Sequence, residues 1–574
     1  MCGILGGNIK SWDYYKGIQE LKHRGPDLQN VVDMGICTLA FARLSIMDLS
    51  DKAMQPMKSE NGMVSILYNG EIYGFQKLRN ELRKTRKFYT TSDTEVVLNA
   101  YMEYGDQFIN YIDGMFAIVI YDRRQQYLKI YRDRYGIKPL YYYVEEDRFA
   151  FASEIKAIIS ASKDKKWQIE NTALYDYLCY QYIPEPKSIY KNIFKLEPAH
   201  CITYDLKNKK IIDEKKYWKL HVNTQKEGKK SKEEIAYNIK NLIKKSVEQQ
   251  MTADVKVGTF LSGGIDSSII TYESNNVQNG IEAYSIGFKE KEFDESRYSK
   301  IFVDRYGINQ KLKYISSRDI IENKSILRKL YDEPFGDTSA YPTFIVSKFA
   351  RKDVKVVLTG DGADELFGGY QRYANYIIST VLKKKINNES EEKVKHIVSK
   401  IMQRDLFKSN LEKYQNQILF DDEKCRKKWR KALKIDNGYD TLWYLRKYWI
   451  DELPALTRLR YLDFKTYLPS DNLTKVDRAT MSQSVEARIP FLNREIVEYV
   501  FSLAEDEVCT VQNLKGILKS AYVSIIPEEI LYRRKKGFSI PDNYIRQNNE
   551  SYTKYMSILK SNWKDILEEV NITS

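Results

Sequence analysis

A cysteine stands directly behind the initiator methionine, in the opening stretch MCGILGG. Removal of Met1 would leave Cys2 with a thiol and a free α-amine, whose pKa of roughly 7.7–8 suits a general base. A thiol nucleophile that carries its own base could attack a carbonyl carbon. A cysteine also packs as a small hydrophobic residue, and these seven letters alone favour that interpretation. The rest of the chain must decide between packing and chemistry.

A second chemical motif, FLSGGIDSS, covers residues 260–268. Strand-like residues lead into Ser-Gly-Gly, and Asp266 and two serines then stand at the expected start of a helix. Glycines let a backbone approach a ligand closely, and amides at a helix N-terminus, joined by serine hydroxyls, bind anions. Asp266 beside phosphates implies a cation between them, and Mg²⁺ prefers this combination of ligands. The motif is no Walker A loop; a purely structural strand–turn–helix connection is the alternative.

An acidic loop, VVLTGDGADELFGGY, follows another apolar strand at residues 356–370. We expect it to place Asp361, Asp364 and Glu365 at the carboxyl edge of the same sheet, where open α/β folds bind ligands. Asp266 and Asp364 could then hold one Mg²⁺ together with the pyrophosphate part of ATP. An isolated acidic glycine loop is more often a plain turn, so its pairing with the first loop carries this prediction.

The elements that position these residues fall into two domains. Residues 1–205 contain short alternating strands and a helix at 93–105, which predicts an α+β domain with antiparallel sheets. Residues 206–235 are lysine-rich and without apolar periodicity, and we expect a linker there. Residues 236–574 begin with the apolar strands KVGTFLSGG, IEAYSIGF and KVVLTGDG between helices, which predicts an α/β domain with a parallel sheet. From about residue 371 the chain is mostly helical in pattern.

Composition excludes several classes of protein. The chain of 574 residues is too long for one core, and no apolar run approaches the ~18 residues that span a bilayer. No secretory signal is present, and the six scattered cysteines read as reduced thiols, so we expect a cytoplasmic protein. The net charge of +14 comes without a zinc-finger, RRM or KH pattern. Basic clusters at 226–232 and 424–431 therefore predict a solvated linker and a helix face, not nucleic-acid binding.

Several motifs, in a fixed order along the chain, resemble those of two protein families. SGGIDSS resembles the pyrophosphate loop of the ATP pyrophosphatases. MCGILGG, HRGPD (23–27), ARLSIMD (42–48), NGEIYG (69–74), SDTEVV (92–97) and GMFAIVIYD (114–122) resemble class II glutamine amidotransferases. In this order on one chain they resemble glutamine-hydrolysing asparagine synthases, and the match continues through YLPSDNLTKVDRATMSQSVEARIPFLN and RRKKGFSIP. The resemblance implies an N-terminal-nucleophile fold followed by a pyrophosphate-loop fold with helical additions, and it makes Cys2 the nucleophile.

The resemblance implies roles for the glutamine site. Cys2, with its α-amine as base, would attack the glutamine carboxamide and form a thioester. The Asn69 side chain and the Gly70 amide would stabilise the oxyanion. Arg43 matches the arginine that binds the α-carboxylate, and Asp93, with Glu71 nearby, matches the acid that holds the α-ammonium.

The resemblance likewise implies roles in the second domain. Lys535 would neutralise charge on the phosphates, Asp361 is a further catalytic position, and Asp266 and Asp364 would bind Mg²⁺. The implied substrates are glutamine, aspartate and ATP, with ammonia passing between the sites and a homodimer as one compatible assembly; neither nucleic acid nor membrane is an expected partner. The implied ATP site comprises Leu261, Ser262, Gly263, Gly264, Asp266, Ser267, Ser268, Ile286, Thr359 and Gly360.

Departures from the family pattern keep other hypotheses open. Asp361 stands where many asparagine synthases have Glu, and Gly74 ends NGEIYG where Asn is usual. DEPFGDTSAYPT aligns loosely with the acceptor-binding loop, so the acceptor could be another carboxylate, such as a sugar acid of a surface polysaccharide. A catalytically idle scaffold is the third hypothesis, and retention of Cys2 and Asp266 argues against it.

Overall fold

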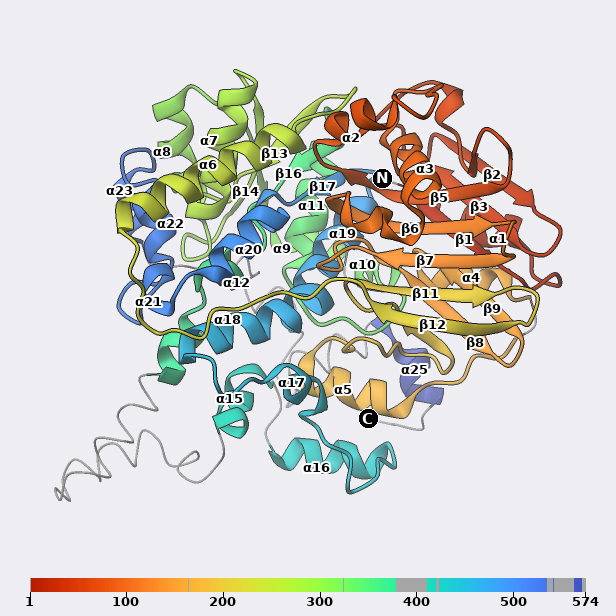
Figure 1. The fold of residues 1–574 in the computed structure, drawn as a ribbon. Helices are drawn as coiled ribbons and strands as arrows, with labels where there is room; N and C mark the ends of the chain where they lie inside the picture. Colours follow the sequence, from red (N-terminus) through yellow and green to blue (C-terminus); the bar gives the residue numbers. More distant parts are fainter. Residues whose placement is uncertain are drawn as a thin grey trace.

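Two antiparallel sheets form the N-terminal domain, which comprises the chain up to Lys216 (Figure 1). The computed structural model describes residues 2–163, 165–323, 325–377, 410–419, 423–533, 540 and 562–569. One six-stranded sheet has the order β10-β8-β9-β1-β3-β2, and the other has the order β12-β11-β7-β6-β5-β4. The predicted antiparallel arrangement is confirmed.

The strands of the first sheet are β1 (Gly3–Gly7), β2 (Leu28–Asp33), β3 (Thr38–Arg43), β8 (Tyr141–Glu145), β9 (Arg148–Ala152) and β10 (Ile193–Lys195). Those of the second are β4 (Met57–Lys58), β5 (Val64–Ile72), β6 (Gly114–Asp122), β7 (Tyr127–Arg132), β11 (His200–Asp205) and β12 (Lys210–Lys216). The helices are α1 (Tyr14–Gln19), α2 (Phe75–Leu82), α3 (Asp93–Tyr104), α4 (Ile155–Ala161) and α5 (Asn171–Tyr180), with 3-10 turns at Asp51–Ala53 and Gly105–Asn110.

Side chains alternate between the two faces of each strand, so the two sheets and the helices outside them pack as four layers. Successive side chains of a strand point to opposite faces, so Leu67 of β5 enters the core between the sheets while Ile66 packs under α2 and α3. In β1, Ile4 faces the other sheet and Leu5 packs against α1 and α4. Both faces of each sheet are thus covered, which explains why β6 is buried along its whole length. The α+β sandwich expected from the sequence is confirmed.

The segment between the domains contains more order than its composition suggests. Within 206–235, β12 pairs antiparallel with β11, and α6 (Lys232–Gln250) begins near its end. The strand is exposed on one face, so its polar, lysine-rich sequence shows little apolar periodicity. The expected linker therefore includes the last strand of the N-terminal domain.

A parallel sheet of five strands lies at the centre of the C-terminal domain, in the order β15-β14-β13-β16-β17. Its strands are β13 (Val257–Phe260), β14 (Glu282–Phe288), β15 (Asn309–Ile315), β16 (Val356–Leu358) and β17 (Glu486–Arg488). All neighbouring pairs run parallel. The three strands predicted from the sequence are confirmed as β13, β14 and β16. Their carboxyl ends meet at one edge, where the loops after β13 and β16 converge.

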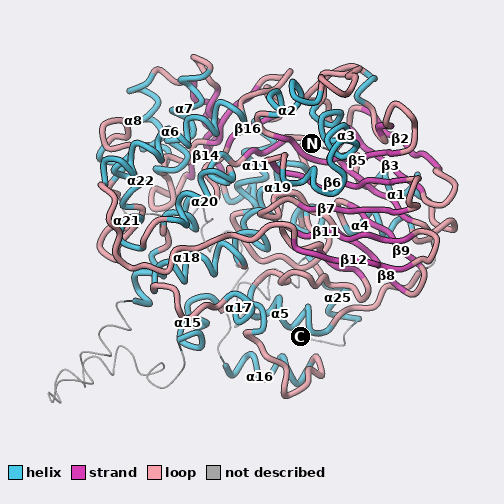
Figure 2. The backbone as a smooth tube through the Cα atoms, in the orientation of Figure 1, coloured by secondary structure: helices cyan, strands magenta, loops and turns pink. Residues whose placement is uncertain are grey.

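Helices surround this sheet and continue beyond it (Figure 2). The basic cluster at 424–431 lies on α16, whose Trp429 is buried, so the cluster is the outer face of a packed helix, as predicted. Among the described residues, no helix combines the length and apolar character needed to cross a bilayer. The helical segments after α6 are α7 (Ile265–Val277), α8 (Ser296–Tyr306), α9 (Ser317–Glu322), α10 (Ile326–Leu330), α11 (Ala340–Ala350), α12 (Ala363–Phe367), α15 (Asn410–Ile418), α16 (Glu423–Ala432), α17 (Trp443–Tyr448), α18 (Ala455–Lys465), a π-turn at Leu468–Leu473, α19 (Thr474–Met481), a 3-10 turn at Pro490–Leu492, α20 (Arg494–Ser502), α21 (Glu505–Val508), α22 (Gly516–Ala521), α23 (Glu528–Leu531) and α25 (Lys564–Glu569).

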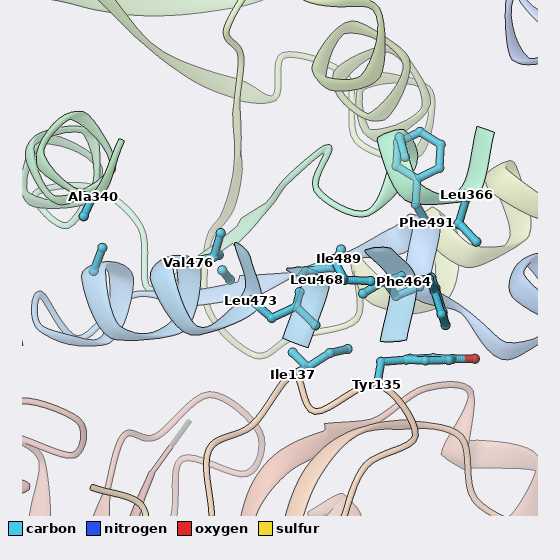
Figure 3. Close-up of a cluster of buried hydrophobic side chains, with 14 of the residues drawn as sticks. Tyr135, Ile137, Ala340, Leu366, Phe464, Leu468, Leu473, Val476, Ile489 and Phe491 are labelled. Carbon is cyan, nitrogen blue, oxygen red and sulfur yellow. The ribbon is translucent and has the colours of Figure 1, made fainter. Parts of the chain in front are cut away.

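The two domains share an apolar contact. Figure 3 shows Tyr135 and Ile137 of the N-terminal domain facing Leu468 and Leu473 of the C-terminal domain. Tyr135 also meets the ring of Phe464 edge-on, with 5.7 Å between ring centroids. These residues belong to the same buried cluster as the core of the parallel sheet. The interface is therefore continuous with the C-terminal core, which fixes one domain against the other.

Candidate functional site

Cys2 lies immediately before β1, in the core between the two N-terminal sheets. Its backbone N–H donates a hydrogen bond to Asn69 Oδ1 at 2.9 Å, and its Sγ lies 4.0 Å from the carbonyl oxygen of Leu44. Burial raises the pKa of the Cys2 thiol above its ordinary value. Such a thiol stays protonated at neutral pH unless a base takes its proton. The nitrogen bound by Asn69 is the one that becomes the α-amine when Met1 is removed.

Of the two polar atoms of the Asn69 side-chain amide, one forms a hydrogen bond with a described residue and the other does not. Asn69 lies in β5, opposite Ala117 of β6, and is fully buried. Its Oδ1 accepts the Cys2 hydrogen bond, whereas Nδ2 makes no hydrogen bond with any described residue. An unsatisfied buried donor costs roughly 1–3 kcal/mol, so its presence next to a thiol marks a place for a ligand oxygen. At Gly70 an added Cβ would lie 2.2 Å from the carbonyl oxygen of Met115, so only glycine fits there.

Three carboxylates gather around the cavity beside Cys2. Glu71 and Asp93 come from the N-terminal domain, and Glu486 comes from β17 of the C-terminal domain. Tyr68 donates its hydroxyl to Asp93 Oδ2 at 2.7 Å, and the Ile72 amide donates to the same oxygen at 3.1 Å. Burial raises the pKa of Asp93 and raises that of Glu71 well above its usual range, with Asp93 adding to the shift at Glu71. The cluster is therefore prepared to receive a cation.

Arg43 lines the same cavity, at the end of β3. Its guanidinium donates to the backbone carbonyls of Asp48 and Ser50, the latter at 2.7 Å. These bonds hold the guanidinium in place at the cavity wall. The cavity has a volume of ≈ 40 Å³. The predicted residues Cys2, Arg43, Asn69, Gly70, Glu71 and Asp93 thus surround one place.

The second site lies at the carboxyl edge of the parallel sheet. The chain leaves β13, turns at Gly263 with φ +79°, and enters α7 at Ile265. Ser262 Oγ and Ser267 Oγ lie 3.1 Å apart, and the Gly264 amide donates to Ser262 Oγ at 3.3 Å. A left-handed backbone favours glycine, which explains the first glycine of the pair. The turn and the first turn of the helix thus bring the predicted residues Ser262, Gly264 and Ser267 together.

A lysine that sequence reasoning missed joins the two acidic loops. Lys515 Nζ lies 2.5 Å from Asp266 Oδ2 and 2.7 Å from Asp364 Oδ1. Its amide donates to the carbonyl of Phe367, at the end of the helix that carries Asp364. A Cβ on Gly369 would lie 1.9 Å from Asp364 Oδ1 and 2.2 Å from Lys515 Cε. The glycine therefore allows the close approach, and both carboxylates lie against the same lysine ammonium.

A cleft of ≈ 340 Å³ opens in front of these carboxylates. Gly263 and Ser268 do not line it: Gly263 shapes the turn, and Ser268 is fully buried on the inner face of α7. Lys535 lies outside the described residues. The predicted residues that line the cleft are Leu261, Ser262, Gly264, Asp266, Ser267, Ile286, Thr359, Gly360, Asp361 and Asp364.

The far end of the cleft carries polar residues that the sequence did not single out. Lys475 Nζ lies 3.5 Å from Asp337 Oδ2 and 2.8 Å from Asn472 Oδ1. Opposite charges across a cleft can bind a zwitterion or orient a carboxylate. The hydroxyl-bearing rings of Tyr370 and Tyr467 complete this end of the wall. Lys475 lies in the stretch YLPSDNLTKVDRATMSQSVEARIPFLN, which resembles the family, but nothing in its spacing shows that Lys475 lines the cleft.

The donor set in the cleft fits a magnesium ion shared with phosphates. Mg²⁺ takes one or two protein carboxylates and fills its other positions with phosphate oxygens and water. Asp266 and Asp364 supply two carboxylates at one position, and Lys515 shows that a cation is accepted there. Among the described residues, no group of three or more His, Cys, Asp or Glu side chains could hold a metal ion by itself.

Two family models match the chain. A family model described as "Asparagine synthase" matches residues 238–567, and one described as "Glutamine amidotransferase domain" matches residues 1–218. The chain belongs to the asparagine synthase family. Members of this family use ATP as co-substrate, and the relatives below named glutamine-hydrolysing asparagine synthetases are ligases. The chain is therefore an enzyme of the glutamine-hydrolysing asparagine synthase type.

Three relatives show the range of this asparagine synthase family. "Asparagine synthetase [glutamine-hydrolyzing] 1" of Bacillus subtilis (strain 168) is 32% identical over 96% of this chain and 88% of its own length. "Putative asparagine synthetase [glutamine-hydrolyzing] 2" of Methanocaldococcus jannaschii is 36% identical over 65% of this chain and 76% of its own. "Amidase chry2" of Gibberella zeae is 25% identical over 94% of this chain and 87% of its own. Similarity thus extends across both domains.

Proposed function

We propose that this enzyme makes asparagine from aspartate, ATP and glutamine. Glutamine is hydrolysed at Cys2, and the ammonia released there reacts with β-aspartyl-AMP in the cleft of the C-terminal domain. The products are asparagine, glutamate, AMP and pyrophosphate. The observation that carries the proposal is Asn69, whose Oδ1 binds the Cys2 nitrogen while its Nδ2 remains an unpaired donor. The approach of Asp266 and Asp364 to one cation position supports the second reaction.

In the first reaction, the α-amine of Cys2 takes the thiol proton, because burial keeps the thiol protonated otherwise. Sγ forms a bond to the carboxamide carbon, and the carbonyl oxygen becomes negative. Asn69 Nδ2 and the Gly70 amide would donate to that oxygen. The C–N bond then breaks with return of the proton to nitrogen, which leaves a glutamyl thioester and ammonia. Water hydrolyses the thioester to glutamate and restores the thiol.

Glutamine is placed for this attack by charge. Arg43 would donate to its α-carboxylate, and Glu71 and Asp93 would accept from its α-ammonium. A buried carboxylate pair of raised pKa gains most from such a cation. The substrate's own charge would therefore ionise the pair that binds it.

In the second reaction, ATP would lie in the cleft with its phosphates on Ser262, Gly264, Asp266 and Ser267 and its adenosine near Leu261, Ile286 and Gly360. Mg²⁺ held by Asp266 and Asp364 would neutralise phosphate charge. The β-carboxylate of aspartate attacks the α-phosphorus, and the bond to pyrophosphate breaks. Lys475, Lys515 and Lys535 would supply positive charge, and Asp361, which lines the cleft, would be a further catalytic residue. Ammonia displaces AMP from the acyl carbon and yields asparagine.

Three further expectations belong to this proposal. Ammonia passes from Cys2 to the cleft inside the protein, the enzyme works in the cytoplasm, and it assembles as a homodimer. We place the domain division within 206–235, after β12, since the two family matches end and begin on either side of it.

A second candidate is an amidotransferase that uses another carboxylate as acceptor. Similarity to a protein named an amidase over most of both chains favours it, as does Asp361 in place of the more usual Glu. Incubation with ATP-Mg²⁺, ¹⁵N-amide glutamine and a set of carboxylates distinguishes the two. We expect labelled asparagine and aspartate-dependent pyrophosphate release. Label in a sugar amide, without label in asparagine, would establish the second candidate.

A further inference from the structure

Arg488 of the C-terminal domain reaches into the cavity region of the N-terminal domain. Its Nη2 lies 3.3 Å from Glu71 Oε2, and its Nε lies 2.6 Å from Glu486 Oε1. The Arg488 side chain is fully buried, and Glu71 is 3% exposed. A buried charge pair that crosses from one domain to another is retained only where its geometry is well fixed.

The rest of the guanidinium is anchored firmly. Arg488 Nη1 donates to the carbonyls of Gln250 and Thr252 at 2.8 and 2.6 Å, at the end of α6. Its backbone carbonyl accepts from the amide of Thr359, the residue after β16. Nη2 makes no hydrogen bond with a described residue although it is buried. One nitrogen of a fixed guanidinium is therefore directed at Glu71 without a completed hydrogen bond.

The charges around Glu71 show how the Arg488 guanidinium affects the ionisation of that carboxyl group. Asp93 on α3 and Glu486 on β17 both place negative charge near Glu71, and together with burial they favour its protonated form. Arg488 opposes them and favours the carboxylate. Removal of Arg488 would leave three buried carboxylates without their guanidinium. The pKa of Glu71, already raised well above its usual range with Arg488 present, would rise further, so the carboxylate that accepts an ammonium would form less readily.

We propose that Arg488 is a positioning residue for glutamine, which holds the Glu71 carboxylate where the substrate's α-ammonium binds. The proposal rests on the proposed glutamine site at Cys2. It means that the C-terminal domain completes the glutamine site, because Arg488 and Glu486 both come from β17. Arg488 acts through Glu71 and does not contact the carboxamide that reacts.

Two substrates separate this role from a structural one. Glutamine carries the α-ammonium, and 4-carbamoylbutanoate has the same carboxamide chain without it. We expect Arg488→Met to lower kcat/KM for glutamine by about tenfold to a hundredfold, mainly through KM, since a charge-assisted hydrogen bond is lost. The rate with 4-carbamoylbutanoate should change less than about twofold, because Glu71 has no ammonium to bind. Ammonia release is the readout for both.

Two variants serve as controls. Lys355→Met removes another ion pair between the domains, to Asp27 at 2.9 Å; neither residue lines the cavity beside Cys2, so both rates should stay unchanged. Arg488→Lys retains one charge and should recover part of the preference for glutamine. It also provides the test if Arg488→Met does not fold, which thermal melting shows.

An equal fall with both substrates would overturn the role of Arg488, because it would indicate a general disturbance of the site. So would a result for Arg488→Met that matches Lys355→Met. Absence of glutamate formation by the wild-type enzyme would instead overturn the proposed glutamine site, and with it the premise for Arg488.

Discussion

Arg24 of the N-terminal domain and Asp477 of the C-terminal domain form a bidentate ion pair that is buried in the domain interface. Arg24 Nη1 lies 2.8 Å from Asp477 Oδ2, and Nη2 lies 3.2 Å from Oδ1. The Nε of the same arginine donates to the carbonyl of Cys2 at 3.2 Å. Arg24 thus contacts both Asp477 and Cys2, so the docking of the domains and the position of Cys2 depend on each other.

Asp477→Ala should destabilise the docked protein by about 3 kcal/mol or more, because it leaves the Arg24 guanidinium buried without this partner. Denaturant unfolding followed by tryptophan fluorescence measures the shift of the midpoint. Lys355→Met, which removes a partly exposed pair across the same interface, should shift the midpoint by less than about 1 kcal/mol. Equal shifts for the two variants would contradict the importance of the buried pair.

Acid should weaken the same contact. Burial favours the protonated form of Asp477, but Arg24 and Lys138 outweigh it and hold its pKa below the usual value. A depressed pKa gives stability that is complete above the unfolded pKa of about 3.9 and is lost as the pH falls below it. Unfolding midpoints between pH 3 and 6 should therefore fall more steeply in the wild type than in Asp477→Asn. Parallel curves would contradict the assignment.

Cys2→Ala should abolish synthesis from glutamine and leave synthesis from added ammonium within about twofold, because the thiol only releases nitrogen. Asparagine formation with each nitrogen source is the measurement. Equal loss of both activities, in a variant with a normal melting temperature, would refute two separate sites.

The active enzyme should begin at Cys2. A retained Met1 would hold the α-amine in a peptide bond, and the buried thiol would lack its base. Intact mass spectrometry of an active preparation decides this. Full release of glutamate from glutamine by protein that retains Met1 would exclude the proposed base.

Asp364→Asn should lose most pyrophosphate release and keep glutamine hydrolysis. The carboxamide preserves shape and removes one of two charges at the cation position, where unit charges ~4 Å apart interact by about 4 kcal/mol at an effective dielectric of 20. Pyrophosphate release with aspartate and glutamate release from glutamine are measured on the same preparation. Near-normal synthesis by the variant would contradict the electrostatic role.

Sequence motifs could predict the position of residues that function close to the helix or strand that carries them. Asn69 lies in β5, and Asp93 and Asp266 stand in the first turns of α3 and α7, each within a short motif of the sequence. Ser268 shows the limit of this reasoning, since neighbouring helix positions differ by about 100° in direction. Ser267 turns toward Ser262, and Ser268 turns into the core.

Residues brought in by distant segments could not be found in the same way. Lys515 reaches Asp266 and Asp364 only because its backbone packs on the end of α12. Glu486 and Arg488 lie in a stretch that resembles the family, but nothing in their spacing shows that they face the Cys2 cavity of another domain. The tertiary packing of distant segments decides such contacts, and local sequence patterns do not predict it.

The late position of β17 in the chain sets an order of events during synthesis. Strands β13 to β16 leave the ribosome well before Glu486, yet β17 pairs with β16 at the edge of the sheet that faces Cys2. The N-terminal sandwich has all its own strands by Lys216 and can form early, since domains fold as units while the chain is made. A nascent chain that ends before β17 would therefore carry a nucleophile domain without Glu486 and Arg488, which lie beside the Cys2 cavity. Glutamine consumption without synthesis is then disfavoured in incomplete chains, because they lack the last piece of the wall around Cys2.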